Sequence, residues 1–471
     1  MSEFVTAETA KRRVMKLIRE GRLTDARRAL EAMGEPRDAD VLGMLGMVCG
    51  MAGDLQAAEP ALKRAVSLRP SDPALRNNFG CVLRALGKKA DAEAQFRESV
   101  RLDPRDLGAR ANLGCALIDS GNLHEAERVL RNVLATVPEH PEALNNLGTA
   151  LRGIGKIAEA TACYEKAVRL RPNYPDALAN LGMSRLFDNR SQEAERCLRA
   201  ALQWAPGHVQ ALYYLGFLLH QRNARSEAES CFRNLLAIDP THANAAYFLS
   251  VIGVSEAPPQ SPSAYVKELF DGYAESFEEH LVGALKYSAP GVMSRLVRTQ
   301  LGASQGSLDI LDLGCGTGLC ARQFTDLAAT ITGVDLSARM LDKVRPMGIY
   351  DRLIQDDVVS FLTGQQNTFD LILAGDLFIY IGDLAEVIPA CARALRDGAI
   401  MCFSTEKSDD HRPYTLRTSG RYAQRSDYII ALARESGLSL RASEQLVLRE
   451  EYGAGITGEV YVLAKEEGPA P

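Results

Sequence analysis

The sequence lacks long apolar runs, contains one tryptophan among its 471 residues, and has no cysteine pair spaced C-x-x-C. No apolar stretch reaches the roughly 18 residues that a membrane-spanning helix requires. The first residues, MSEFVTAETAKRRVMKLI, carry charges where an export signal needs an apolar core. These absences predict a cytoplasmic protein with no membrane partner.

The ten cysteines are spread through the chain and not paired. Cys81 and Cys115 lie 34 residues apart, as do Cys163, Cys197 and Cys231. A period of this length places each cysteine at an equivalent position of a repeated unit, where it serves as a small buried apolar residue. We therefore expect neither disulfides nor a metal site.

Acidic residues are concentrated in the second half of the chain. Residues 1–255 hold 34 Lys and Arg against 30 Asp and Glu, a net charge of +4, whereas residues 256–471 hold 20 against 30, a net charge of −10. An acidic domain is repelled by a phosphate backbone, so we expect no nucleic-acid partner. A chain of this length also exceeds a single hydrophobic core, which predicts two or three domains.

A unit of 34 residues recurs through the first half of the chain. It is marked by glycine at Gly46, Gly80, Gly114, Gly148, Gly182 and Gly216, and by proline at Pro70, Pro104, Pro138, Pro172, Pro206 and Pro240. Small residues let two helices approach closely, and each proline ends the second helix of a unit. Such helix pairs stack into a solenoid because no pair can bury its apolar face alone. The pattern resembles the tetratricopeptide repeat family, with six clear units over residues 39–242, a degenerate unit before them and a capping helix near 243–253.

An asparagine stands two residues before the repeat glycine in four consecutive units, at Asn78, Asn112, Asn146 and Asn180. The resemblance implies that this position faces the concave groove of the solenoid, and the series is similar to that of the peptide-guiding superhelix of O-GlcNAc transferase. An amide both donates and accepts hydrogen bonds, so a row of amides can pair with an extended peptide backbone. The groove is therefore predicted to bind a protein or peptide, while solvated surface asparagines are the alternative.

The 34-residue period ends near residue 253, which assigns residues 1–253 to the solenoid. The segment VSEAPPQSP at 254–262 is typical of a linker or a tight connection. Residues 263–471 alternate expected strands and helices, which is typical of a mostly parallel sheet covered on both faces. The strands are expected near 308–313, 330–335, 351–355, 369–375, 398–404, 441–449 and 459–465, and the helices near 318–328, 337–346 and 384–396. Each half is long enough for its own core, so residues 263–471 are expected to fold alone.

The stretch ILDLGCGTG at 310–318 places Gly314, Gly316 and Gly318 at the end of the first expected strand. A dinucleotide site needs G-x-G-x-x-G, but Leu319 stands at the position of its last glycine, and a phosphate loop G-x-x-x-x-G-K-[ST] is also missing. The negative carboxylate of Asp312 would be unfavourable beside phosphates, whereas it suits a ligand that carries an ammonium group. Asp335, at the end of the second strand, can accept both hydroxyls of a ribose. A ribose and an ammonium group without phosphate describe S-adenosylmethionine.

Residues 308–463 resemble a class I S-adenosylmethionine-dependent methyltransferase in the motifs D-x-G-x-G-x-G, ITGVDLS and FDLILAGD. Together with SAYVKELFDGYAESFEEHLV, YIGDL and SGRYAQ, these motifs resemble methyltransferases that carry tetratricopeptide repeats. The resemblance implies a multidomain protein, an all-α solenoid followed by a Rossmann-like α/β domain.

The same resemblance assigns cofactor contacts to individual residues. The three glycines would let the backbone approach the methionine part, Asp312 would contact the amino group, and Asp335 would hold the ribose. The adenine contacts would come from Leu336, Met340 and either Asp356 or Asp357, with Asp357 favoured. Tyr273 and Phe277 stand four residues apart, on one face of a leading helix that closes over the cofactor in related enzymes; plain packing on the sheet is the alternative.

Methyl transfer requires an aligned nucleophile, exclusion of water and, for some acceptors, removal of a proton. The exit of the fourth strand, AGDLFIYIGD, offers Asp376 and Tyr380 as candidate bases. Arg421, after the fifth strand, can clamp a carboxylate, and Gln424 stands where the resemblance implies a histidine. The [ND]-P-P-[YF] motif of enzymes that methylate adenine or glutamine amino groups is missing, which disfavours those substrates.

Three functions are compatible with this pattern. The leading hypothesis is a methyltransferase whose repeats recruit a protein or peptide acceptor. The second is a methyltransferase of a small molecule, with repeats that serve in complex assembly. The third, a scaffold with a degenerate catalytic domain, is disfavoured by the intact residues between Asp312 and Asp335.

Overall fold

The computed structural model describes residues 2–33, 38–274, 277, 278, 281, 283, 285–301, 306–451 and 454–466. Two compact units make up the chain, Met1–His208 and Val209–Pro471. The division falls one repeat before the composition break at 254–262, because the last repeat packs with the sheet-containing unit. None of the described helices is long and apolar enough to cross a membrane.

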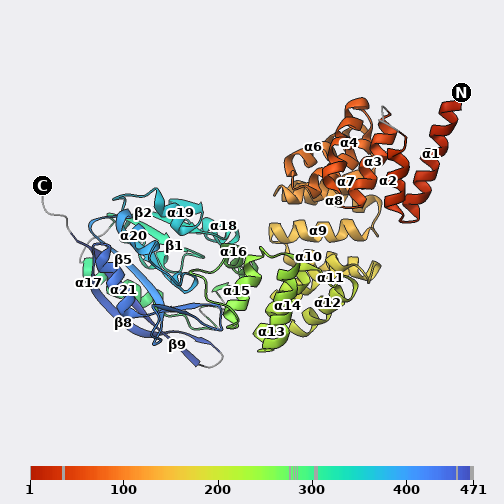
Figure 1. Cartoon of the computed structure of the whole chain (residues 1–471). Helices are drawn as coiled ribbons and strands as arrows, with labels where there is room; N and C mark the ends of the chain where they lie inside the picture. Colours follow the sequence, from red (N-terminus) through yellow and green to blue (C-terminus); the bar gives the residue numbers. More distant parts are fainter. Residues whose placement is uncertain are drawn as a thin grey trace. The chain divides into compact units, whose positions relative to one another are not determined.

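The first unit consists of antiparallel helix pairs, red to yellow in Figure 1. Its helices are α1 (Ser2–Arg19), α2 (Leu23–Glu31), α3 (Ala39–Met51), α4 (Leu55–Leu68), α5 (Pro73–Ala85), α6 (Lys89–Leu102), α7 (Leu107–Asp119), α8 (Leu123–Thr136), α9 (Pro141–Ile154), α10 (Ile157–Leu170), α11 (Pro175–Phe187) and α12 (Ser191–Trp204). The repeat glycines are needed because the paired helix carries a bulky side chain opposite them. A Cβ atom at Gly80 would lie 2.7 Å from the ring of Phe96, and one at Gly148 would lie 2.6 Å from Tyr164. The predicted solenoid is thus confirmed.

The second unit begins with the last repeat and continues into an α/β domain. Its helices are α13 (Val209–Gln221), α14 (Arg225–Ile238), α15 (Ala243–Val251), α16 (Ser263–Tyr273), α17 (Ala289–Leu301), α18 (Ala338–Val344), α19 (Val358–Thr363), α20 (Val387–Ala394) and α21 (Ser426–Glu435). Its strands are β1 (Leu308–Leu313), β2 (Ala328–Asp335), β3 (Arg352–Gln355), β4 (Phe369–Ala374), β5 (Leu395–Lys407), β6 (Tyr414–Leu416), β7 (Tyr422–Gln424), β8 (Leu438–Glu451) and β9 (Ala454–Lys465).

The described strands form one sheet in the order β3-β2-β1-β4-β5-β7-β6, in which the pairs from β3 to β7 are parallel. Strand β9 joins β5 in antiparallel orientation, and β8 joins β9. Alternate residues of β1 enter two cores: Leu311 and Leu313 pack with α20 and α21, whereas Ile310 packs with α17 on the other face. The predicted α/β fold is confirmed. The strand order reverses direction between β1 and β4, where ligands bind in such sheets.

One expected helix is wrong. Residues 318–328 form only a short 3-10 helix, Ala321–Gln323. The reason is that few residues remain between the glycine turn and the start of β2. The glycine turn uses residues 314–318, so residues 319–327 must cover the length of the six-residue strand β1, about 20 Å. Nine residues of α-helix would span only about 14 Å.

The segment 254–262 is a hydrogen-bonded connection. Gln260 forms a β-bridge with Ile381. Ser261 N donates to Tyr380 O at 2.8 Å, and Gly382 N donates to Pro259 O at 2.8 Å. Tyr422 Oη donates to Pro258 O at 2.7 Å. This segment therefore packs against the strand ends where the predicted site lies.

Candidate active site

A cavity of 810 Å³ lies at the carboxyl ends of the parallel strands in the second unit. Its lining combines the strand ends with the last repeat, α16 and the loop between β6 and β7. Of the residues predicted from sequence, the lining includes Tyr273, Asp312, Gly314, Gly316, Asp335, Leu336, Asp357, Asp376, Tyr380 and Arg421. Gly318, Met340 and Asp356 lie outside it; Met340 is fully buried in the core.

The glycine turn after β1 is tied to the end of β2. Gly314 and Gly316 have φ values of +64° and +49°, in the left-handed region that favours glycine. Gly316 N donates to Asp335 Oδ2 at 2.8 Å. A side chain at Gly316 would also fill space below Phe277, whose ring lies 3.9 Å from the Cβ position. At Gly314 and Gly316 the turn therefore presents backbone and no side chain to the cavity.

Both carboxylate oxygens of Asp335 accept hydrogen bonds from nearby backbone N–H groups. Besides Gly316 N, it accepts a bond from Ser337 N to Oδ1 at 2.8 Å. Its side chain is buried, and burial raises the pKa of its carboxyl although these backbone bonds lower it. Each carboxylate oxygen has a second lone pair, so both oxygens can still accept from a ligand hydroxyl.

Asp312, at the end of the neighbouring strand, is almost fully buried. Tyr350 Oη donates to Asp312 Oδ2 at 2.7 Å. Burial raises the pKa of Asp312 to about 7, with the Tyr350 bond opposing this shift. The sequence did not predict a role for Tyr350. It lies in the turn before β3, where no sequence motif indicates that its side chain reaches Asp312. The absence of a side chain at Gly333 makes room for that ring, since a Cβ there would lie 2.8 Å from it.

The two candidate adenine acids differ in their surroundings. Asp357 lines the cavity and caps α19, where its Oδ1 accepts from Val359 N at 3.0 Å. Asp356 Oδ1 accepts from Asp357 N at 2.8 Å and lies outside the cavity lining. The arrangement favours Asp357 as the residue that meets a ligand.

The segment that contains Tyr273 and Phe277 lies over the glycine turn, but the prediction that these two residues share one face of a helix is wrong. Helix α16 ends at Tyr273, and Phe277 lies beyond its end, although both line the cavity. The helix is fixed to α18 through Asp271, which accepts from Ser337 Oγ at 2.6 Å. Residues 275 and 276 lie outside the described part of the chain.

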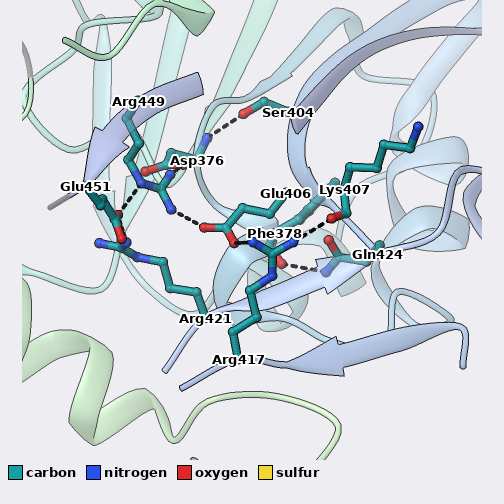
Figure 2. A network of polar contacts seen from close by, with 10 residues as sticks. All are labelled: Asp376, Phe378, Ser404, Glu406, Lys407, Arg417, Arg421, Gln424, Arg449 and Glu451. Atoms are coloured by element: carbon teal, nitrogen blue, oxygen red, sulfur yellow. Dashed lines mark hydrogen bonds and ion pairs between the residues drawn. The ribbon is translucent and has the colours of Figure 1, made fainter. Parts of the chain in front are cut away.

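The other end of the cavity holds a network of buried charges centred on Arg449 (Figure 2). Arg449 is fully buried; its Nη1 donates to Asp376 Oδ1 at 2.8 Å and its Nε to Glu451 Oε1 at 2.6 Å. Its Nη2 also pairs with Glu406. Asp376 has a φ of +55°, a strained conformation for a non-glycine residue. Arg449 was missed because a charged residue in a strand pattern is ordinarily read as solvent-facing.

The arginines of the loop between β6 and β7 are also paired (Figure 2). Arg421 pairs with Glu451, and Arg417 Nη1 lies 3.2 Å from Glu406 Oε2. Burial raises the pKa of Glu406 against the lowering effect of these arginines. A role of Arg421 as a clamp for a ligand carboxylate would require the pair with Glu451 to open.

Tyr380 and Gln424 complete this end. Tyr380 is buried with its ring 5.6 Å from that of Phe270, and burial raises the pKa of its phenol. A raised pKa makes Tyr380 a poor base near neutral pH. Gln424 Nε2 donates to the carbonyl oxygens of Phe378 and Ile381, both at 2.8 Å, so it supports the loop after β4.

The four asparagines predicted to face the groove lie on α5, α7, α9 and α11, and three of them, Asn112, Asn146 and Asn180, bond to the preceding repeat. Asn112 Nδ2 donates to Asn77 Oδ1 and Asn180 Nδ2 to Asn145 Oδ1, both at 2.9 Å. Asn146 Nδ2 donates to Cys115 Sγ at 2.8 Å. The bonds of Asn112 and Asn146 are made by their amide nitrogens, so the carbonyl oxygens of these two side chains keep the capacity to accept. Among described residues, no cluster of three or more His, Cys, Asp and Glu is placed to hold a metal ion.

Comparison with known proteins finds similarity to repeat families in the first half of the chain and to a methyltransferase domain in the second. Residues 310–398 match the methyltransferase domain family, and tetratricopeptide repeat families match residues 12–74, 74–102, 111–175, 163–196 and 188–252. A ubiquinone biosynthesis O-methyltransferase of Thiobacillus denitrificans is 30% identical over 128 residues, 26% of this chain and 52% of that protein. A malonyl-[acyl-carrier protein] O-methyltransferase of Enterobacter lignolyticus is 29% identical over 122 residues, 26% of this chain and 46% of that protein. The chain spans about half the length of these curated relatives.

Two solved structures match parts of this chain. A 1,6-didemethyltoxoflavin-N1-methyltransferase from Burkholderia thailandensis, with bound 1,6-didemethyltoxoflavin and S-adenosylhomocysteine, is 20% identical and matches with a TM-score of 0.36 over 45% of this chain and 94% of that chain. A tetratricopeptide repeat protein from Parabacteroides merdae is 15% identical, with a TM-score of 0.45 over 52% of this chain and 98% of that chain.

Proposed function

We propose that this chain, which joins tetratricopeptide repeats to a methyltransferase domain, transfers the methyl group of S-adenosylmethionine to an acceptor that enters the cavity. The observation that carries the proposal is the pair of buried carboxylates Asp312 and Asp335. Neither forms an ion pair with any described residue of the chain. Buried negative charge without a partner is unfavourable, so the pair fits a ligand that carries positive charge and hydroxyl groups. A dinucleotide, with its negative phosphates, fits poorly.

When bound, S-adenosylmethionine supplies a methyl group on an activated, positively charged sulfur. In our proposal Asp335 accepts from the ribose hydroxyls, and Asp312 faces the ammonium group. The glycine turn lets the ligand approach the backbone, and Phe277 covers the turn and excludes water. Asp376 holds the acceptor proton through Oδ2, since Oδ1 accepts from Arg449. That ion pair keeps the carboxylate oriented toward the cavity.

The acceptor, we propose, is a protein or peptide that the repeats recruit. Four amides at equivalent positions of α5, α7, α9 and α11 support this idea, because they lie at a regular spacing along one solenoid. A small-molecule acceptor is the second candidate, supported by the names of the curated relatives and by a cavity lined by many aromatic residues.

Calorimetry with S-adenosylmethionine and with NAD tests the cofactor assignment. We expect S-adenosylmethionine to bind and NAD to bind far more weakly. Asp335→Ala should weaken binding by about 2 kcal/mol, roughly 30-fold, because it removes charge-assisted hydrogen bonds. Asp342→Ala is the matched control, since this aspartate lies on α18 with a side chain 76% exposed. NAD binding at equal strength, or an unaffected Asp335 variant, would overturn the assignment.

A further inference from the structure

The last repeat contributes a wall to the cavity of the methyltransferase domain. Phe217, His220 and Gln221 of α13 line the same cavity as Gly314 and Asp335. Their spacing of three and four residues places them on one face of the helix. Phe217 and His220 are both partly exposed, so their side chains are available to a ligand. The repeat glycine Gly216, directly before them, is still used for packing against Phe232 of α14.

This wall is fixed to the loop that carries Arg417 and Arg421. The His220 ring interacts with the backbone of Thr418, in the middle of that loop. Tyr247 Oη, on α15, donates to Gly420 O at 2.6 Å. Next to this contact, the ring of Phe248 lies 5.2 Å from that of Tyr265, in an edge-on arrangement. The last repeat and the helix α15 that follows it are therefore in direct contact with the loop between β6 and β7.

The wall is aromatic. Phe217 packs edge-on against Phe248 at 5.3 Å, and the His220 ring lies 5.6 Å from Phe248. On the side of α16 and the loop after β4, Phe270 and Tyr380 line the same cavity. Aromatic walls of this kind recognise flat apolar groups, because ring edges and faces offer large contact areas in preferred geometries.

The charges at this end of the cavity cancel. Arg417, Arg421 and Arg449 stand against Asp376, Glu406 and Glu451, and each of these six forms an ion pair within the set. A charged acceptor would have to open one of these pairs, which is unfavourable in a buried site. An uncharged acceptor leaves them intact.

We propose that α13 of the last repeat forms part of the acceptor site, and that Phe217 and His220 select an uncharged aromatic ring that bears the group to be methylated. This inference rests on the proposed methyltransferase function. It assigns the last repeat to the catalytic centre and leaves the earlier repeats for recruitment. The ring can belong to a free small molecule or to a tyrosine side chain, since both present the same chemistry.

The test uses the full chain loaded with S-adenosylhomocysteine and two probes that share the naphthalene ring, neutral 2-naphthol and anionic 2-naphthoate. We expect 2-naphthol to bind at least tenfold more tightly than 2-naphthoate. Phe217→Ala and His220→Ala should each weaken 2-naphthol at least fivefold, while the affinity for S-adenosylhomocysteine changes less than twofold. Ile238→Ala, an exposed apolar residue of α14 in the same repeat, is the control and should change neither.

The outcomes separate this inference from the function on which it rests. If the wild-type chain does not bind S-adenosylhomocysteine, the proposed function fails. If it binds S-adenosylhomocysteine but not 2-naphthol, or binds both naphthalene probes equally, the acceptor class is wrong. Unchanged 2-naphthol binding in both variants would overturn the role of α13. Incubation of a cell extract with labelled S-adenosylmethionine, followed by separation by size, then distinguishes small-molecule rings from tyrosine side chains.

Discussion

Tyr350 donates a hydrogen bond from its phenol to Asp312 Oδ2 at 2.7 Å, beneath the glycine turn. The bond stabilises the ionised form of a carboxyl whose pKa burial raises to about 7. Asp312 therefore changes charge close to neutral pH in the ligand-free protein. Because the proposed cofactor is a cation, this titration links its binding to pH.

We predict that the affinity for S-adenosylmethionine falls as the pH drops below 7. A cation prefers the ionised carboxyl, so binding must release a proton whenever Asp312 is protonated, and the dissociation constant should rise by about tenfold between pH 8 and pH 6. Calorimetry at several pH values measures this change. Asp309→Asn, an aspartate of the same strand paired with Arg396, should keep the wild-type profile. A dissociation constant that is flat from pH 6 to pH 8 would contradict the burial argument.

Tyr350→Phe should move the same profile to higher pH. Loss of the phenol removes the hydrogen bond that lowers the pKa of Asp312, so a larger fraction of the carboxyl is protonated at pH 7. The affinity at pH 7 should fall a few-fold and should recover at pH 9. A uniform loss at all pH values would indicate a packing defect and not a change in titration.

Arg449→Met should strongly destabilise the second unit. The variant leaves Asp376, Glu406 and Glu451 without their shared buried partner, which typically costs about 3–5 kcal/mol. Scanning calorimetry of the full chain should show one transition lowered by about 8–12 °C, given the usual relation between stability and melting temperature. Arg441→Met, an exposed arginine of the same strand, is the control. A shift of the Arg449 variant no larger than that of the control would show that the charges are solvated.

The sequence predicts the strands that carry the cofactor residues better than those that carry the acceptor residues. Strands β1 (LDILDL) and β4 (FDLILA) are mostly apolar and buried, so their ends, and with them Asp312 and Asp376, could be located from the pattern. Strands β6 and β7 have three residues each, too few for a period; they pair with each other across a short loop, and β7 also pairs with the end of β5. The partners of Arg421 and Asp376 come from β8, so no local pattern could reveal that both are already paired.

In the repeats, too, the sequence pattern does not reveal long-range contacts. Their period locates Phe217 and His220 on a helix, but it treats α13 as one more copy of the preceding units. Contacts that no period reveals, of His220 with Thr418, of Tyr247 with Gly420 and of residues 258–261 with the strand ends, show that this copy belongs to the unit that contains the sheet.

A fragment of residues 209–471 should fold and bind S-adenosylhomocysteine, whereas residues 263–471 should not. The shorter fragment loses the Tyr247 bond to Gly420 and the Pro258 carbonyl that accepts from Tyr422, and it exposes Tyr265. Circular dichroism and calorimetry on both fragments measure folding and binding. Equal melting temperatures and affinities would show that the last repeat is an appendage, as the composition break at 254–262 suggests.

The groove asparagines provide the last test. Changing Asn78, Asn112, Asn146 and Asn180 together to Ala should raise the Michaelis constant for a protein acceptor at least tenfold, since each amide can contribute about 0.5–1.5 kcal/mol to a bound backbone. The variant should also lose some stability in the first unit, because Asn180 is buried and two of the four amides bond to Asn77 and Asn145. The double variant Asn77→Ala/Asn145→Ala is therefore the matched control: it removes the same two bonds between repeats but keeps all four groove amides. With labelled S-adenosylmethionine and a cell extract, the quadruple variant should label proteins more slowly than the double variant, while both bind the cofactor equally. If the two variants label the same proteins at the same rates, the repeats do not guide the acceptor, and if only small molecules are labelled by either, the chain acts on a small-molecule acceptor.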